Sequence, residues 1–243
     1  MPKALYIVEP EDFVLTAARI LENELLAALE DADFRRRTPG RADIAVSLAG
    51  GSTPRPVYET LVEITDPFFP WERLQLWLGD ERWVGAHNEQ SNERMIRQTI
   101  MRAPGFDNRS LWSVDRLHGG PDTGALLYEK KMPARGEFDV MVLGVGADGH
   151  TASIFPHSAA ARERERMVVH SIAPVEPVHR VTITLPVISK ARRLLTLAYG
   201  SHKAAAVAAA IEGDVSYEEC PARVARDGIW VLDTGAASAL RNS

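Results

Sequence analysis

The sequence has little of three features that mark secreted, membrane-spanning or nucleic-acid-binding proteins. Cys220 is the only cysteine among 243 residues, which excludes an intrachain disulfide and a cysteine-based zinc site. The longest apolar stretches, such as Ala204–Ile211, are far shorter than the roughly 20 residues that span a bilayer. The short apolar run near the N-terminus is interrupted by acidic residues, unlike a signal peptide. We therefore expect a soluble, cytoplasmic protein with no membrane partner.

An excess of positive charge is also missing. Lys and Arg total 28 against 33 Asp and Glu, so the formal net charge is −5. Binding to a phosphate backbone needs clustered cations on a net basic face, and we expect no nucleic-acid partner. The cations that hold an anionic ligand must therefore be local. With 45% hydrophobic residues, the chain is long and apolar enough to bury a full core.

Short apolar runs alternate along the chain with segments of helical spacing. The runs are typical of buried parallel strands and lie at residues 43–48, 74–78, 138–143 and 194–199. The helical segments lie at residues 13–29, 57–64, 95–101, 124–132 and 201–211. This order predicts an α/β fold with a doubly wound, mostly parallel sheet, helices on both faces, and ligands beyond the carboxyl ends of the strands.

Domain boundaries are not evident. The charged stretches 33–41 and 159–166 are short, and no long linker rich in proline, glycine or serine divides the chain. We expect a single domain over residues 1–243.

The first predicted strand is followed by Ala-Gly-Gly-Ser-Thr-Pro at residues 49–54. Gly50 and Gly51 let the backbone approach a ligand, Ser52 or Thr53 suits a helix cap, and proline suits a first helical turn. The exposed N–H groups of such a helix start favour a phosphate, although an ordinary capped turn fits the same residues. The P-loop pattern is absent, so a nucleoside triphosphate is not indicated.

The second predicted strand is followed by Gly-Asp-Glu-Arg-Trp-Val at residues 79–84. Asp80, Glu81 and Arg82 suit proton transfer, hydroxyl recognition and anion stabilisation. A weak surface salt bridge is the alternative. The position just beyond a strand favours a functional role.

The third predicted strand is followed by a glycine-rich loop at residues 144–156 that matches the Gly-x-Gly-x-x-Gly dinucleotide pattern. A dinucleotide site also needs an acid at the end of the next strand. Glu163 and Glu165 instead come before the strand-like run 167–172. The pattern alone is therefore a weak indication of a dinucleotide.

The same loop presents Asp148 and His150 two residues apart. A histidine acts as base and acid near neutral pH because its reference pKa is about 6.5, and a neighbouring carboxylate fixes its tautomer. A structural or merely exposed histidine is the alternative. The glycines, the acid and the strand-end position together favour catalysis.

Three further polar residues are expected at the same edge of the sheet. Ser91 resembles a helix cap that directs Asn92 toward the crevice. Lys203 falls in the first turn of a predicted helix capped by Ser201, where a cation is unfavourable by about 0.3–1 kcal/mol unless an anion binds. A lysine turned into solvent is the alternative, and Arg180 alone fits a surface arginine. The other histidines lack metal-binding spacing, so we expect no catalytic metal.

Taken together, these segments resemble the 6-phosphogluconolactonase family. The matching segments occur in the family's order and are 49–54, 79–84, 91–95, 144–156, 180–186 and 200–204. The resemblance implies a fold similar to that of glucosamine-6-phosphate deaminase and ribose-5-phosphate isomerase. It also implies hydrolysis of 6-phospho-D-glucono-1,5-lactone to 6-phosphogluconate in the oxidative pentose phosphate pathway, without a cofactor.

The resemblance further implies a role for each site residue. His150 would be the general base that activates water, with Asp148 and Asp80 orienting the sugar, the water or His150. Arg82 and the backbone N–H groups around Gly149 would stabilise the oxyanion. Substrate and phosphate binding fall to Gly50, Gly51, Ser52, Thr53, Asn92, Gly149, Arg180 and Lys203. The expected partner is a phosphorylated sugar lactone, and the chain is expected to be a monomer or weak homo-oligomer.

Two alternatives stay open. Glucosamine-6-phosphate deaminase shares the glycine-rich first loop and the Asp-Gly-His loop. Its pattern continues toward Phe-Asn-Glu-Pro, whereas residues 153–156 here read Ser-Ile-Phe-Pro, and Arg82-Trp83 stands where the deaminase resembles Tyr-Val. A non-catalytic sugar-phosphate sensor would need an output module. No such module is visible, and the intact Asp148-Gly149-His150 favours retained chemistry.

Overall fold

The computed structural model describes residues 1–35 and 44–241. The strands are β1 (Ala4–Val8), β2 (Ile44–Leu48), β3 (Leu74–Leu78), β4 (Asp80–Arg82), β5 (Leu111–Trp112), β6 (Val140–Gly144), β7 (Val168–Ile172), β8 (His179–Ile183), β9 (Leu194–Ala198) and β10 (Ile229–Asp233). The α-helices are α1 (Phe13–Arg35), α2 (Pro54–Ile64), α3 (Asn92–Gln98), α4 (Pro121–Lys131), α5 (Ala159–Arg162), α6 (Leu185–Ile188), α7 (Ala204–Ile211) and α8 (Thr234–Ala237).

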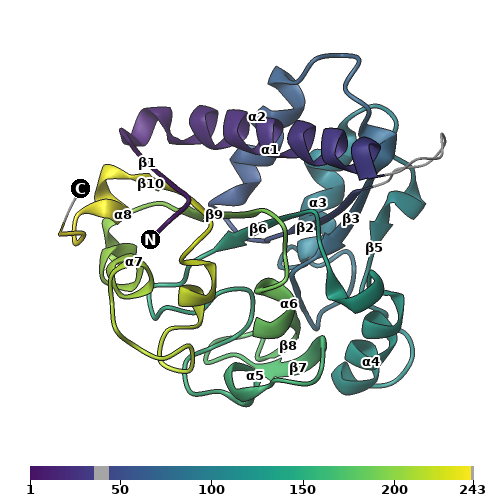
Figure 1. The fold of residues 1–243 in the computed structure, drawn as a ribbon. Helices are drawn as coiled ribbons and strands as arrows, with labels where there is room; N and C mark the ends of the chain where they lie inside the picture. The colour runs from purple at the N-terminus through teal and green to yellow at the C-terminus, as the bar shows by residue number, and fades with distance from the viewer. Residues whose placement is uncertain (36–43, 242–243) are drawn as a thin grey trace.

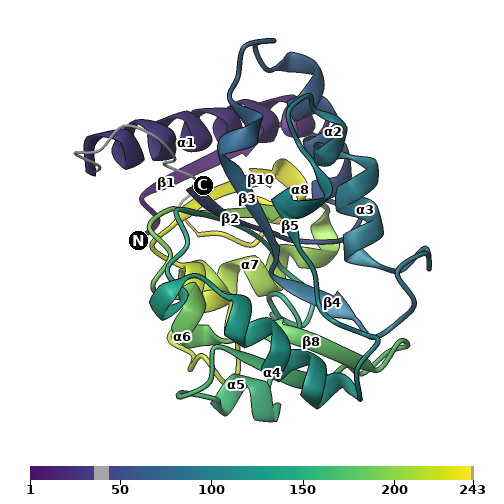
Figure 2. The same cartoon turned by 90° about the vertical axis from the view of Figure 1, so that its right-hand side faces the viewer.

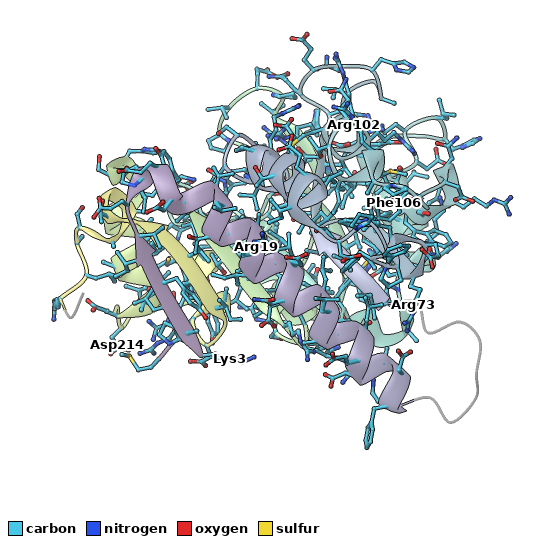
Figure 3. All side chains as sticks on the ribbon, turned by 90° about the horizontal axis from the view of Figure 1, so that it is seen from above. Lys3, Arg19, Arg73, Arg102, Phe106 and Asp214 are labelled. Carbon is cyan, nitrogen blue, oxygen red and sulfur yellow. The ribbon has the colours of Figure 1, made fainter. Side chains whose placement is uncertain are left out.

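Seven parallel strands form the central sheet in the order β1-β10-β9-β6-β2-β3-β5. Helices α1 and α2 lie over one face, and α4, α6 and α7 lie on the other side (Figure 1). Helix α1, with its labelled Arg19, runs diagonally over the sheet (Figure 3) and contacts β10, β2 and β6. The expected fold class, a doubly wound parallel sheet covered on both faces, is confirmed.

The central strands are apolar at nearly every position because successive side chains enter two different cores. Val140 and Val142 face the core under α1 and α2, whereas Met141 and Leu143 face the core on the side of α4 and α7. This explains why the four runs predicted as strands, which correspond to β2, β3, β6 and β9, lack polar alternation.

The expected helices are also present, and three of the five begin a turn earlier than their apolar periodicity suggested. Helix α2 begins at Pro54, α3 at Asn92 and α4 at Pro121, since a capped first turn needs no buried side chain. Residues 36–43, which include most of the charged stretch 33–41 and the first residue of the predicted strand 43–48, lie outside the described residues. The single domain stays a prediction. Among the described helices, none combines the length and apolarity needed to cross a membrane.

A second, antiparallel sheet of β4, β8 and β7 was not expected from the sequence. The segment 79–84, predicted as a loop, leaves the central sheet at Gly79 and enters this sheet as β4, where Arg82 pairs with Arg180. Helix α4 packs on β7 and β8, and β4 lies beside β8 (Figure 2). Asp80 and Arg82 are therefore held on a strand.

Strands β9, β6, β2 and β3 are neighbours, and their carboxyl ends lie along one edge of the sheet. The segments that follow them are the four that the sequence singled out: 199–203, 145–156, 49–54 and 79–82. Parallel pairing thus gathers side chains from distant parts of the chain.

A buried carboxylate fixes the start of α3 beneath β4. Glu81, 1% exposed, accepts hydrogen bonds from the backbone N–H groups of Asn92 and Glu93 and from the Ser91 hydroxyl. Arg116 supplies the neutralising charge, with Nη1 2.8 Å from Glu81 Oε2 and a further ion pair to Glu93. The predicted cap is confirmed, since Ser91 Oγ accepts from the Arg94 N–H at 3.2 Å.

Replacing Arg116 by methionine should be strongly destabilising, because the buried carboxylate of Glu81 loses its counter-ion and Glu93 keeps only its pair with Arg97. Removal of one partner from a buried pair costs about 3–5 kcal/mol, and Arg116 is only 10% exposed. Urea unfolding would measure the loss. Arg19→Met is the matched control, since its pair with Glu22 is 55% exposed on the arginine side and should contribute under about 1 kcal/mol. Equal effects of the two substitutions would contradict this role for Arg116.

Candidate active site

A cleft of about 420 Å³ opens at the carboxyl edge of the sheet. It is lined by ten of the twelve residues predicted for the site: Gly50, Gly51, Ser52, Thr53, Asp80, Arg82, Asn92, His150, Arg180 and Lys203. Asp148 and Gly149 do not line it. The cleft combines cations, the carboxylate of Asp80 and the imidazoles of His150 and His202, as an anionic substrate that undergoes proton transfer requires.

Another cleft, of about 570 Å³, lies at the opposite edge, near the amino ends of β9 and β10. Two of its three arginines are matched by acids: Arg193 pairs with Asp31 and Glu24, and Arg192 pairs with Glu137. Size alone does not make it a site. In the smaller cleft, none of Arg82, Arg180 and Lys203 lies within salt-bridge distance of a carboxylate of the described residues.

His150 is positioned by its own loop. Its Nδ1 lies 2.6 Å from Asp148 Oδ1, and the same oxygen accepts the His150 backbone N–H at 3.1 Å. Because Nδ1 is engaged, Nε2 is the ring nitrogen available to a ligand in the cleft. The Phe155 ring packs against the imidazole, with the centroids 4.8 Å apart. Gly146 leaves room for the ring, since a Cβ there would lie 2.1 Å from His150 Nδ1.

Asp148 is kept ionised by this contact. Partial burial acts to raise the pKa of its carboxyl, but hydrogen bonds from the His150 side chain and backbone outweigh burial and leave that pKa below its usual value. A carboxylate at Nδ1 favours the tautomer with the proton on Nδ1 and a lone pair on Nε2. Asp148 therefore orients the imidazole from behind.

Gly149 has a different place from the one predicted. Its N–H donates to the Gly146 carbonyl at 3.0 Å, and its own carbonyl accepts from the Ala222 N–H at 3.0 Å. With φ at +87° it makes the turn that brings His150 round, above buried Cys220. The N–H of Gly149 itself is therefore used within the turn and is not free for a substrate oxyanion, while the role of the other backbone N–H groups around Gly149 stays a prediction.

Asp80 is held at both oxygens. Ser153 Oγ donates to Oδ2 at 2.6 Å, and Asn92 Nδ2 donates to Oδ1 at 3.2 Å and to the Asp80 carbonyl at 2.8 Å. Ser153 comes from the histidine loop and Asn92 from α3. Asp80 thus ties three elements together at the cleft wall.

Asn92 lies directly under the first glycine-rich turn. It is 2% exposed, and its Oδ1 finds no hydrogen-bond partner among the described residues. A Cβ on Gly50 would lie 1.9 Å from that oxygen, so only glycine fits there. This acceptor is therefore buried in the cleft wall without a partner among the described residues.

Arg82 and Arg180 enter the cleft from paired positions on β4 and β8. Arg82 donates Nη1 to the Gln90 carbonyl, and Arg180, 7% exposed, donates Nε to the Pro177 carbonyl. Burial, followed by the nearby Arg82 charge, lowers the pKa of Arg180. Neither guanidinium lies within salt-bridge distance of a carboxylate in the described part of the chain. An anion in the cleft would offset both the burial of the Arg180 charge and its repulsion by Arg82.

Lys203 lies near the start of α2. Its Nζ donates to Thr53 Oγ1 at 3.4 Å, and burial lowers its pKa, which Asp233 opposes. The N–H groups of Gly51 and Ser52 have no backbone acceptor among residues 1–35 and 44–241. One ammonium and two free N–H groups form an anion site at a helix start.

Two predicted caps are wrong in detail. The Thr53 hydroxyl does not cap α2 and accepts from Lys203 instead. Ser201 does not cap a helix either, since Gly200 begins a 3-10 turn over Ser201–Lys203 and α7 follows. Lys203 consequently lies at the N-cap of α7, still beside its positive end.

Sequence reasoning missed several residues of this region. Ser153 and Phe155 were used only to separate family patterns, and Val175, 64% exposed at the end of the β7–β8 hairpin, was not considered. Nothing in a single sequence links residue 153 to Asp80, because the contact is tertiary. Glu81, considered as a cleft carboxylate, does not line the cleft and instead anchors α3.

Comparison with known proteins agrees with this arrangement. The model of the glucosamine-6-phosphate isomerases/6-phosphogluconolactonase family matches residues 9–231. A 6-phosphogluconolactonase of Nostoc sp. is 32% identical, over 91% of this chain and 94% of the relative. The structure of the Leishmania guyanensis 6-phosphogluconolactonase superposes with a TM-score of 0.80 at 29% identity, covering 97% of each chain.

A monomeric glucosamine-6-phosphate deaminase superposes with a TM-score of 0.77 at 21% identity, covering 97% of this chain and 99% of the deaminase, and shows the shared fold alone. Since the family model matches residues 9–231, which include every segment that lines the cleft, the chain belongs to the glucosamine-6-phosphate isomerase/6-phosphogluconolactonase family.

Proposed function

We propose that this protein hydrolyses 6-phospho-D-glucono-1,5-lactone to 6-phosphogluconate. The observation that carries the proposal is the carboxylate-oriented His150 in a cleft whose cations lack carboxylate partners. A neutral lactone ring with a dianionic phosphate needs both parts, one for proton transfer and one for anion binding. The relatives named 6-phosphogluconolactonase support the same substrate.

In the proposed mechanism, His150 is the general base. Nε2 takes a proton from water as the water oxygen attacks the lactone carbonyl carbon, and a tetrahedral intermediate forms. The intermediate collapses with cleavage of the bond between that carbon and the ring oxygen, and the imidazolium returns its proton to the departing oxygen. Asp148 stabilises the imidazolium in between. Positioned proton transfer of this kind contributes about 10²- to 10⁴-fold in rate.

The cleft's cations divide between two anionic groups in this proposal. Arg82 stabilises the developing oxyanion, which the backbone N–H of Gly149 does not reach. Lys203, Arg180 and the start of α2 hold the 6-phosphate, and Asn92 and Asp80 meet sugar hydroxyls. Fixing the phosphate at one end places the carbonyl at the histidine end.

Two rival functions fit the cleft less well. An amine-releasing enzyme of the deaminase pattern has a glutamate in the stretch where this chain has Ser153, and Ser153 here is bonded to Asp80. A non-catalytic sensor would bind the phosphorylated sugar and leave lactone decay unchanged. The oriented His150–Asp148 pair supports turnover. Action in the oxidative pentose phosphate pathway, a cytoplasmic location and a monomeric or weakly associated state stay predictions.

Replacing His150 by alanine should lower lactone hydrolysis at least tenfold, because the proton acceptor is removed. Glucose-6-phosphate dehydrogenase would generate fresh lactone in a coupled assay, with spontaneous opening subtracted. Binding of 6-phosphogluconate should be largely retained. His118→Ala is the matched control, since its Nδ1 also faces a carboxylate, Asp115, at 2.9 Å but outside the cleft. Near-normal turnover by His150→Ala would overturn the mechanism.

Lys203→Ala should raise KM for the phosphorylated lactone by roughly tenfold or more, because a hydrogen bond to a charged group is worth about 1.5–3 kcal/mol. The maximal rate should change much less, and glucono-1,5-lactone without phosphate should react equally with both proteins. Lys3→Ala, at the opposite edge of the sheet, is the control. An unchanged KM would mean that the phosphate binds elsewhere.

Binding of 6-phosphogluconate should weaken as the pH rises and Lys203 loses its proton. Because burial lowers the pKa of Lys203 from 10.5, this weakening should begin at a lower pH than it would with a solvent-exposed lysine. Between the lowered pKa and 10.5 the folded chain holds fewer protons than the unfolded chain, so the free protein gains stability as pH rises. Calorimetric titrations across the alkaline range would measure the binding. Lys203→Arg should abolish this loss, and a profile identical to that of the unsubstituted protein would contradict the assignment.

A further inference from the structure

The β7–β8 hairpin carries two histidines whose ring nitrogens face each other outside the catalytic cleft. His170 lies on β7 and His179 begins β8, and the ladder pairs Ile172 with His179. Residues 170 and 172 share a face of the strand, so the two histidines are diagonal neighbours on one face of the hairpin. His170 Nε2 lies 3.0 Å from His179 Nδ1. Neither ring lines the cleft.

This spacing suits a metal ion with two imidazole ligands. Metal–nitrogen bonds of about 2.0–2.1 Å place adjacent ligands of a square-planar or tetragonal ion about 2.9 Å apart, and those of a tetrahedral ion about 3.3 Å apart. The observed separation of 3.0 Å lies at the tetragonal end. Imidazole nitrogens in tetragonal positions are typical of Cu²⁺ and Ni²⁺.

A carboxylate stands behind the first histidine. Asp122, near the start of α4, has Oδ2 3.3 Å from His170 Nδ1. A carboxylate on the outer nitrogen of a metal-binding histidine fixes the ring and makes the other nitrogen a stronger donor. It also offsets part of the ion's positive charge. The three side chains come from three elements, since α4 packs on both β7 and β8.

The pair is open enough for water to complete the coordination. The His170 side chain is 17% exposed, His179 is exposed, and the Asp122 side chain is 83% exposed. In the part of the chain that the structure describes, no group of three His, Cys, Asp or Glu side chains could hold a metal ion. The protein supplies two ligands here and solvent supplies the rest.

We propose that His170 Nε2 and His179 Nδ1 together chelate a divalent ion of the Cu²⁺ or Ni²⁺ type, with Asp122 orienting His170. In the metal-free protein one of the two nitrogens donates a hydrogen bond to the other, and when the ion binds, the donor ring moves its proton to its other nitrogen. The ion then links β7 to β8 beside the strand position that carries Arg180 into the cleft. Binding to the folded state should therefore raise the unfolding temperature.

Titration of the untagged full-length protein with Cu²⁺ alone would test the proposal, by calorimetry for stoichiometry and affinity and by electron paramagnetic resonance for the number of bound nitrogens. We expect one ion per chain with two coordinated imidazole nitrogens. His170→Gln and His179→Gln should each weaken binding by at least about tenfold and leave one nitrogen. Asp122→Asn should weaken it by roughly tenfold without changing the nitrogen count.

Two controls separate this site from others. His118→Gln removes an exposed histidine beside a carboxylate and should leave Cu²⁺ binding unchanged. Lactone hydrolysis by the His170→Gln and His179→Gln proteins, measured without metal, reports that they are folded. Unchanged affinity and nitrogen count in both variants would overturn the proposal, as would loss of the ion in His150→Ala, which would place it in the catalytic cleft.

Discussion

The buried carboxylate of Glu81 holds the start of α3 beneath β4, and the geometry of the cleft depends on that junction. Glu81 gathers the N–H groups of the first helical turn, so Asn92 faces the cleft and its amide reaches Asp80. The neighbouring β4 residue, Arg82, is carried to the opposite side of the strand from Glu81 and into the cleft. Arg116, which comes from a segment that takes no part in the cleft, neutralises Glu81 and so offsets the cost of burying its charge.

The pairing of acidic side chains also explains how a cleft in a chain of net charge −5 can favour an anion. The two acids predicted for the site are already engaged: Asp148, behind the imidazole, accepts from His150, and Asp80, in the cleft wall, accepts from Ser153. They orient neighbours and leave the cations uncompensated. Burial lowers the pKa of Arg180 and Lys203, which means that each charge is held at a cost that a phosphate would relieve. In the proposed mechanism, binding and catalysis therefore use separate charges at one cleft.

Much of this arrangement could be predicted from the sequence, because strands buried on both faces leave continuous apolar runs and the next few residues must lie at the sheet edge. That logic located β2, β3, β6 and β9 and the segments holding His150 and Lys203. It could not find β4, a three-residue polar strand stabilised by pairing with β8. It also misjudged Gly149, since a turn's own hydrogen bonds decide which N–H stays free. Ser153 and Arg116 act through tertiary contacts that no local pattern records.

Opening of the lactone by the unsubstituted protein tests the central claim most directly. The carbonyl carbon of freshly made 6-phospho-D-glucono-1,5-lactone, labelled with ¹³C, can be followed by NMR as the ring ester becomes a carboxylate. The structure predicts that this conversion accelerates in proportion to protein concentration, while glucosamine-6-phosphate under the same conditions releases no ammonia. A lactone that decays at its spontaneous rate in the presence of the folded protein would contradict the account.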